Sequence, residues 1–218
     1  MAIVLREALD ILSLSYPRLT SEGFGARFMD EVLSTMWIKY PWKQSIAKLP
    51  PFHPINQEAD YGAPTSAIPT DFFALHDVWL KNSYHYEKEL SILANLKPSY
   101  YVGEPEAISY IPEVPAFRLY PRPNLNPPYW WVEGRYKKKP TRVTDLTLSS
   151  ATFPFDDLYF SVMRQGMYWK YQSEIVKDPR STEQYSLFLA MLREMAISEG
   201  VHQGAHVIHP EFELSFGG

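Results

Sequence analysis

Proline is concentrated in the middle of the chain, and this distribution limits the structures that the middle can adopt. Most of the 19 prolines lie between positions 50 and 140. Proline lacks a backbone N–H and its ring clashes with the preceding helical turn, so it is excluded from helix interiors. We therefore expect no long helix in this segment, only short extended pieces separated by rigid turns.

Several stretches within the proline-rich segment have the composition and spacing of β-strands. Residues 72–80 and 84–93 are separated by a turn-like Lys-Asn-Ser sequence, which predicts a hairpin. Residues 107–111 and 116–120 flank Pro-Glu-Val-Pro and predict a second hairpin. Residues 129–136 are rich in aromatic side chains and form the most strand-like stretch of all.

Apolar residues with helical spacing lie on both sides of this segment. Before it, they recur every three or four positions over residues 3–16 and again over about 20–38. After it, the same spacing is found between Phe155 and Asp178, and then from Ser181 until Gly200 ends the pattern. These patterns predict two helices, a β-rich insertion and two further helices.

The predicted fold class is α+β, with three parts. Residues 1–49 and 153–200 should form an antiparallel bundle of about four helices. Residues 50–152 should form an inserted antiparallel β-rich domain, and residues 201–218 an extended C-terminal arm.

Composition excludes several classes of function. The chain of 218 residues has no cysteine, which rules out disulfides, thiolate nucleophiles and sulfur-ligated zinc. Its net charge of −4 argues against general attraction to nucleic acid, so any DNA contact needs a local patch. No apolar run is long enough for a transmembrane helix, and the N-terminus does not read as a signal peptide. No motif for a cofactor or a catalytic triad is present.

A basic run begins within the most strand-like stretch and, counting Glu133, gives a local charge of +4 in a chain of −4. Such a run could contact phosphates in a channel or acidic residues of a neighbouring subunit. It could equally be a solvated strand edge on which lysines block unwanted pairing. The five cations are Arg135, Lys137, Lys138, Lys139 and Arg142.

Aromatic residues precede and enter the basic run. Trp130 and Trp131 should point to opposite faces of a strand, so one is expected in a core and the other in an interface. With Tyr136 they are the candidate interface aromatics, and a platform for stacking bases or sugars is the alternative.

Two further groups of polar residues are candidate sites. Asp156 and Asp157 could act as paired carboxylates of a glycosidase, but adjacent helical residues diverge, so a helix cap explains them better. A histidine-rich cluster near the C-terminus has metal-ligand residue types. Glycines at 200 and 204 interrupt the helix that such a site needs, so we predict no metal and no catalytic residue. The cluster is His202, His206, His209 and Glu211.

The C-terminal segment alternates between apolar and polar residues without a partner strand at hairpin distance. This pattern indicates an arm that pairs with another chain, or a strand docked on its own β domain, or a frayed end. The candidate anchoring residues are Val207, Ile208, Phe212, Leu214 and Phe216.

The order of these pieces resembles the head-to-tail adaptor (connector, head-completion, tail tubular-like) proteins of tailed bacteriophages. The resemblance covers roughly residues 1–200. It is carried by Leu5-x3-Leu9, Tyr40-Pro41-Trp42, Ile68-Pro69-Thr70-Asp71-Phe72, Arg118-Leu119-Tyr120-Pro121-Arg122-Pro123, residues 132–144 and Phe155-Asp156-Asp157-Leu158-Tyr159.

The resemblance implies a structural virion protein of the neck and not an enzyme. Members of this family form a ring of identical subunits, typically twelve, below the portal protein, and extend the channel for genomic DNA without reading its sequence. It also implies a downstream tail or nozzle protein as partner, no membrane contact and assembly in the host cytoplasm. In several relatives a C-terminal extension reaches along the portal, a role that would suit residues 201–218.

Two alternatives come from the residues themselves. The carboxylates and aromatic residues would suit a virion-associated cell-wall glycoside hydrolase. The basic run would suit a non-specific nucleic-acid-binding module.

Overall fold

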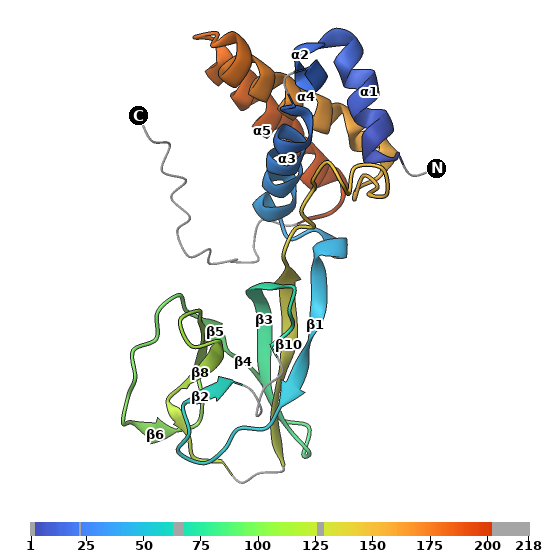
Figure 1. Cartoon of the computed structure of the whole chain (residues 1–218). Coiled ribbons are helices and arrows are strands. Elements are labelled where there is room, and N and C mark those ends of the chain that lie inside the picture. Colours follow the sequence, from blue (N-terminus) through green and yellow to red (C-terminus); the bar gives the residue numbers. More distant parts are fainter. Residues whose placement is uncertain (1–2, 22, 63–67, 126–128, 202–218) are drawn as a thin grey trace. The chain divides into compact units, whose positions relative to one another are not determined.

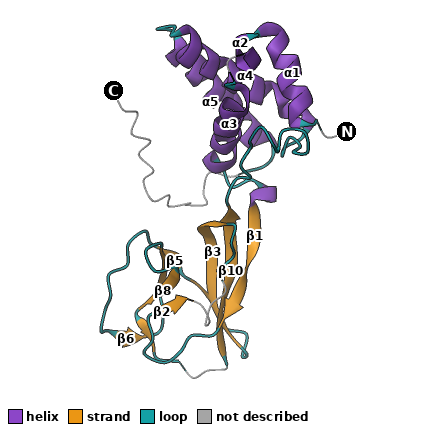
Figure 2. Cartoon of the chain, viewed as in Figure 1, coloured by secondary structure: helices purple, strands orange, loops and turns teal. Residues whose placement is uncertain are grey.

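The computed structural model describes residues 3–21, 23–62, 68–125 and 129–201, and it divides into two compact units (Figure 1). Unit 1 contains the described residues of 1–42 and 140–201, and unit 2 contains those of 43–139. Unit 1 is mainly helical and unit 2 is built from strands (Figure 2). The sequence-based boundaries at 50 and 152 differ from these, because unit 2 already includes residues 43–49 and the loop after residue 139 belongs to unit 1.

Unit 1 contains five α-helices among its described residues. The 3-10 helix Asp157–Tyr159 leads into the fourth helix, and the π-helix Tyr171–Val176 continues it. The α-helices are α1 (Leu5–Ser15), α2 (Arg18–Ser21), α3 (Gly25–Lys39), α4 (Phe160–Lys170) and α5 (Ser181–Ser198).

Helix α4 packs against both α3 and α5 in the core of unit 1. Gly166 of α4 makes the close approach possible: an added Cβ would lie 2.6 Å from Val32 Cγ1 and 3.0 Å from Phe188 Cε2. Val32 and Phe188 are fully buried, as are Met163 and Met167. The apolar stripes predicted from helical spacing therefore meet at α4.

The predicted antiparallel bundle of about four helices is wrong, although the α+β class is right. The expected helix over 20–38 is divided into α2 and α3, because Gly23 between them adopts a left-handed backbone with φ +72°. An added Cβ at Gly25 would lie 2.7 Å from Leu9 Cδ1, so the start of α3 also lies close against α1. The result is five helices of unequal length and not four long ones.

Unit 2 contains two four-stranded sheets. Sheet 1 has the order β1 (Ile46–Phe52), β10 (Trp130–Lys138), β3 (Phe72–Asn82) and β4 (Glu87–Glu89), with all pairs antiparallel. Sheet 2 has the order β2 (Asp60–Gly62), β8 (Ala116–Tyr120), β7 (Ala107–Ile111) and β5 (Ser91–Ile92). A short pair joins β6 (Val102–Gly103) to β9 (Arg122–Pro123).

The predicted hairpin over 107–111 and 116–120 is confirmed as β7–β8. Of the stretch 84–93 in the other predicted hairpin, only β4 pairs with β3, while β5 pairs with β7 in sheet 2. The sheets are mostly antiparallel, as expected, but β5–β7 and β6–β9 pair in parallel. An aromatic cluster forms the core of unit 2, in which Phe52 and Phe72 each pack against Phe117, with ring centroids 5.9 and 5.4 Å apart. Unit 2 thus has a core of its own.

Candidate functional site

The basic run enters the structure along β10, and its members do not form one surface. Arg135 is half-exposed and its Nε donates hydrogen bonds to both carboxylate oxygens of Asp77, at 3.0 and 2.8 Å. These bonds raise the pKa of Arg135 above its usual value. Lys139 is exposed after the strand ends, whereas Arg142 lies in unit 1. The net positive charge counted along the sequence is therefore divided and partly neutralised.

Lys137 is the member of the run whose position is least expected. Its side chain is fully buried, and burial lowers the pKa of its ammonium group to about 7. Lys138 is half-buried beside it. A buried lysine cannot contact phosphates, so Lys137 does not belong to a DNA-facing patch in this structure.

The three candidate interface aromatics have different surroundings. Tyr136 is 5% exposed and packs on Phe72 in the core, while its hydroxyl donates to Asp71 Oδ1 at 2.7 Å. Burial, with that hydrogen bond, raises the pKa of Tyr136 to about 12. Tyr136 is thus a core residue and not a surface aromatic.

Trp130 and Trp131 are both half-buried. Trp130 packs against the core of unit 2 and contacts the Tyr86 ring edge-on, with centroids 5.3 Å apart. Trp131 donates from Nε1 to Glu133 Oε2 at 3.2 Å. Trp131 and Glu133 follow the alternation of a strand and share its other face.

The predicted anchoring arm and the histidine cluster lie outside the described residues. This concerns Val207, Ile208, Phe212, Leu214 and Phe216, together with His202, His206, His209 and Glu211. Within the part of the chain that the structure describes, no group of three His, Asp or Glu side chains could hold a metal ion. In that same part, no helix is both long and apolar enough to cross a lipid bilayer.

Asp156 and Asp157 both have structural roles. Asp156 Oδ1 accepts a hydrogen bond from the backbone N–H of Leu158 at 2.9 Å and so caps the helix that leads into α4. Asp157 Oδ1 accepts from the backbone N–H of Ile3 at 3.2 Å. The cap predicted from the sequence is confirmed, and each carboxylate is held by a different backbone group.

We expect Asp156→Ala to lower the free energy of unfolding by about 1 kcal/mol, because the N–H of Leu158 loses its acceptor. Asp156→Asn keeps an acceptor oxygen and should cost less than about 0.5 kcal/mol. Urea unfolding followed by circular dichroism measures both. Equal losses for the two variants would contradict the capping role.

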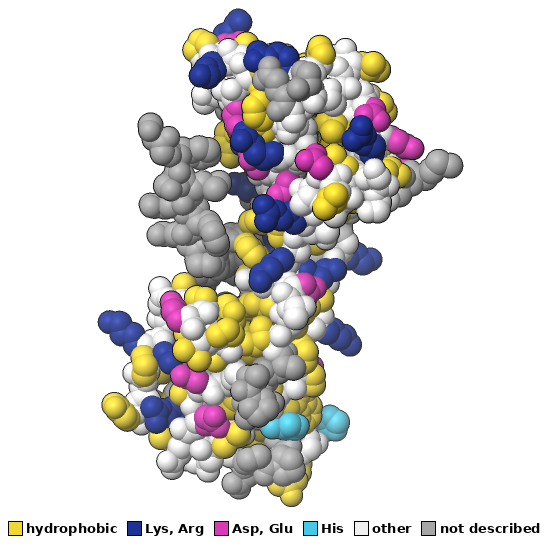
Figure 3. Space-filling view, viewed as in Figure 1, with side chains coloured by type: hydrophobic (Ala, Val, Ile, Leu, Met, Phe, Trp, Pro, Cys, Tyr) yellow, Lys and Arg dark blue, Asp and Glu magenta, His cyan; other side chains and the backbone are white. Residues whose placement is uncertain are grey.

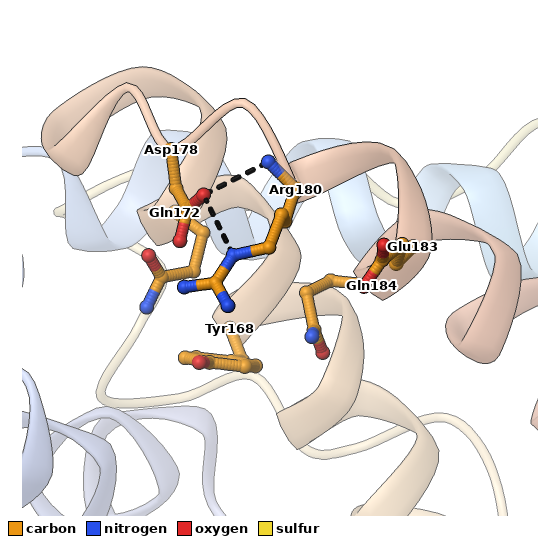
Figure 4. A pocket seen from close by; sticks show the side chains of 6 residues that line it. All are labelled: Tyr168, Gln172, Asp178, Arg180, Glu183 and Gln184. Atoms are coloured by element: carbon orange, nitrogen blue, oxygen red, sulfur yellow. Dashed lines mark hydrogen bonds and ion pairs between the residues drawn. The ribbon is translucent and has the colours of Figure 1, made fainter.

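One small polar pocket of about 180 Å³ lies where the π-helix meets the start of α5 (Figure 4). Its only cation is held within the pocket, since Arg180 donates its backbone N–H to Asp178 Oδ1 at 2.8 Å and its Nε lies 3.5 Å from the same oxygen. Nothing in the sequence indicates this pocket. The lining contains no nucleophile paired with a base. It consists of Tyr168, Gln172, Asp178, Arg180, Glu183 and Gln184.

Comparison with known families decides between these interpretations. The model of the SU10 adaptor protein family matches residues 52–207, well over half of the chain. The chain belongs to the SU10 adaptor protein family. The resemblance to phage head-to-tail adaptors is thereby confirmed, and membership supports a structural role. No curated protein matches the chain.

The adaptor exposes large apolar side chains on both units. In unit 1, Leu14, Leu146 and Leu158 are 85%, 93% and 82% exposed. In unit 2 the exposed set is dominated by tyrosines, including Tyr84 and Tyr100 at 77% and 91%. On the face shown in Figure 3, charges of both signs are interspersed over the helical unit of the adaptor.

The exposed face of sheet 1 carries a network of ion pairs that the sequence did not reveal. Lys81 Nζ lies 2.6 Å from Glu133 Oε1 and 3.2 Å from Glu87 Oε1. The hydrogen bond between Lys81 and Glu133 raises the pKa of the lysine and lowers that of the carboxylate. The ring of Trp79 lies beside two cations of this face. Its centroid is 5.8 Å from Lys81 Nζ and 5.9 Å from Arg135 Cζ. This face therefore offers fixed charges and a half-buried aromatic ring for recognition.

Proposed function

We propose that this adaptor forms a ring of identical subunits, typically twelve in the phage family that it resembles, beneath the portal protein of a tailed phage. The ring links the capsid to a downstream tail or nozzle protein and extends the channel for the genome, which passes without sequence-specific binding. The adaptor assembles in the host cytoplasm and ends in the virion neck. It has no cofactor and catalyses no reaction.

Membership of the SU10 adaptor protein family carries this proposal. The exposed leucines of unit 1 and tyrosines of unit 2 support it, because subunits of a ring bury apolar and aromatic surface against their neighbours. The mixed charges of the surface also suit a protein past which DNA must move, since strong phosphate binding would hold the genome back.

Within this proposal, residues 201–218 anchor the adaptor to the portal. The support is the alternation of apolar and polar residues, which suits addition of a strand to another chain. Ile208, Phe212, Leu214 and Phe216 would supply the apolar contacts, with Val207 at the start of the alternating part of the segment.

Native mass spectrometry of the adaptor with its portal ring tests the proposal. The full-length chain should give a discrete complex, and a chain ending at Gly200 should lose portal binding by at least about a hundredfold, because the whole apolar anchor is removed. A full-length variant carrying Ser215→Ala serves as control and should bind normally. If the full-length chain does not bind the portal, the proposed function is wrong. If the shortened chain binds equally well, only the anchoring role is wrong.

A further inference from the structure

The two edge strands of sheet 1, β1 and β4, differ in the charge of their side chains. Strand β1 is hydrogen-bonded to β10 alone and β4 to β3 alone, as far as the described residues go. The free edge of β4 presents backbone N–H and C=O groups, whereas β1 lacks N–H donors at Pro50 and Pro51, so a contact at β1 depends on its side chains. The two edges are on opposite sides of the same sheet, separated by two central strands.

Charges in the middle of the sheet are matched within the chain. Arg135 of β10 is the register partner of Asp77 of β3, and the two side chains form an ion pair. Lys81 of β3 is likewise paired with Glu133 of β10. The centre of this face therefore has little net charge.

The β1 edge is left with positive charge. Lys48 on β1 and Lys43 in the 3-10 turn Lys43–Ser45 just before it are both exposed. Neither makes an ion pair within 4 Å among the described residues, although Lys48 is near enough to Glu133 to contribute to the lowered pKa of that carboxylate. Lys48 is the register partner of Arg135, whose own charge is already taken up by Asp77.

The β4 edge is left with negative charge. Glu89 is exposed and makes no ion pair within the described part of the chain. Glu87 shares Lys81 with Glu133, so two carboxylates meet one ammonium group. Lys88 of the same strand is neutralised by Glu104 at 3.0 Å. Thus one sheet has a basic edge and an acidic edge.

We propose that the β1 edge of one adaptor copy meets the β4 edge of the next copy in the ring, with Lys43 and Lys48 facing Glu87 and Glu89. This inference rests on the proposed ring. A closed ring needs a heterologous contact, in which two different patches of the same chain are complementary. The two edges meet this requirement because they carry opposite charge on opposite sides of one sheet.

A second copy explains both edges at once, whereas a different partner would explain only one. Charged residues on edge strands also occur simply to prevent aggregation. In that case the sign of the charge at each edge would be irrelevant, so exchanging the signs separates the two explanations.

The test uses two full-length variants with reversed edges. In Lys43→Glu/Lys48→Glu both edges are acidic, and in Glu87→Lys/Glu89→Lys both are basic. Each variant alone should need a protein concentration at least about tenfold higher than wild type to form rings, because like charges meet at every contact. Mixed in equal amounts, they should regain assembly as rings of alternating copies, since each contact again joins opposite charges.

Native mass spectrometry of the adaptor alone and on its portal ring gives the number of subunits in each ring and the number contributed by each variant. The control variant Lys97→Glu/Arg193→Glu makes the same charge change at exposed residues outside sheet 1 and should assemble like wild type. Circular dichroism confirms that each variant is folded.

Three results would decide the matter. Loss of assembly in each variant with recovery in the mixture supports the edge contact. Normal assembly of either single-edge variant, or a folded mixture that does not recover, overturns it. If wild type forms no ring under any of these conditions, it is the proposed ring itself that fails.

Discussion

Gly134→Ala should unfold unit 2 or destabilise it by at least about 3 kcal/mol, because the added methyl group has no room. Gly134 lies in the centre of β10, opposite Val78 on one side and Leu49 on the other. An added Cβ would lie 2.2 Å from the carbonyl oxygen of Asp77 and 2.9 Å from Val78 Cα. Both are backbone atoms of β3, so the clash is relieved only if the two central strands move apart.

Unfolding in urea measures the effect, with tryptophan fluorescence and the helical circular dichroism signal recorded on the same samples. The helical signal should largely persist, because unit 1 has a separate core. Gly103→Ala is the matched control in unit 2, since its Cβ would meet only ordinary contacts, the nearest at 3.5 Å. That variant should change stability by less than about 1 kcal/mol. Equal stability of both variants would show that β3 and β10 are not so closely apposed.

The strands of unit 2 could be predicted because proline and aromatic residues mark them. Proline at 112 and 115 delimits β7 and β8, whose predicted bounds agree with the structure. The sequence could not indicate that Gly134 is required by close approach of β3, since that depends on a strand more than 50 residues away. Nor could it predict the parallel pairs β5–β7 and β6–β9, which are only two residues long.

The surroundings of the basic run could be predicted less well than the bounds of the strands, and the reason is the pattern of burial on β10. A lysine run is normally solvated, so the sequence pattern predicts that Lys137 is exposed like its neighbours. The register shifts between Arg135 and Tyr136, and again between Lys137 and Lys138. Tyr136 and Lys137 are both buried, which requires that both faces of the strand are covered at this end. Alternation along one strand carries no information about such coverage.

The acidic and basic edges of sheet 1 could not be recognised from the sequence either. Lys48 and Glu89 are far apart along the chain, and each is surrounded by residues of mixed charge. Only the strand order shows that they are on opposite edges. The pairing of Asp77 with Arg135 then shows which charges remain unbalanced. The difference in charge between the two edges is thus visible only once the internal ion pairs have been identified.

The buried Lys137 should make the stability of the adaptor depend on pH between about 7 and 10. In the folded protein its pKa is about 7, whereas in the unfolded chain it returns to the ordinary value of 10.5. Between these two values the unfolded chain binds a proton that the folded protein does not. The free energy of unfolding therefore rises with pH in this window, by up to about 1.4 kcal/mol per pH unit. Below about pH 7 both states are protonated and the penalty is constant.

Lys137→Met removes this titration and isolates its contribution. At pH 7 the variant should gain up to about 5 kcal/mol relative to wild type, apart from any difference in packing between lysine and methionine. A difference in packing between lysine and methionine shifts the difference between the two proteins equally at every pH, whereas the titration makes that difference shrink as pH rises to 9.5. The slope, measured by urea unfolding at several pH values, is therefore the decisive quantity. Lys139→Met, at an exposed position two residues later, should change stability by less than about 0.5 kcal/mol throughout. A difference between Lys137→Met and wild type that does not vary with pH would mean that Lys137 keeps its proton in the folded protein, stabilised there by its neighbours.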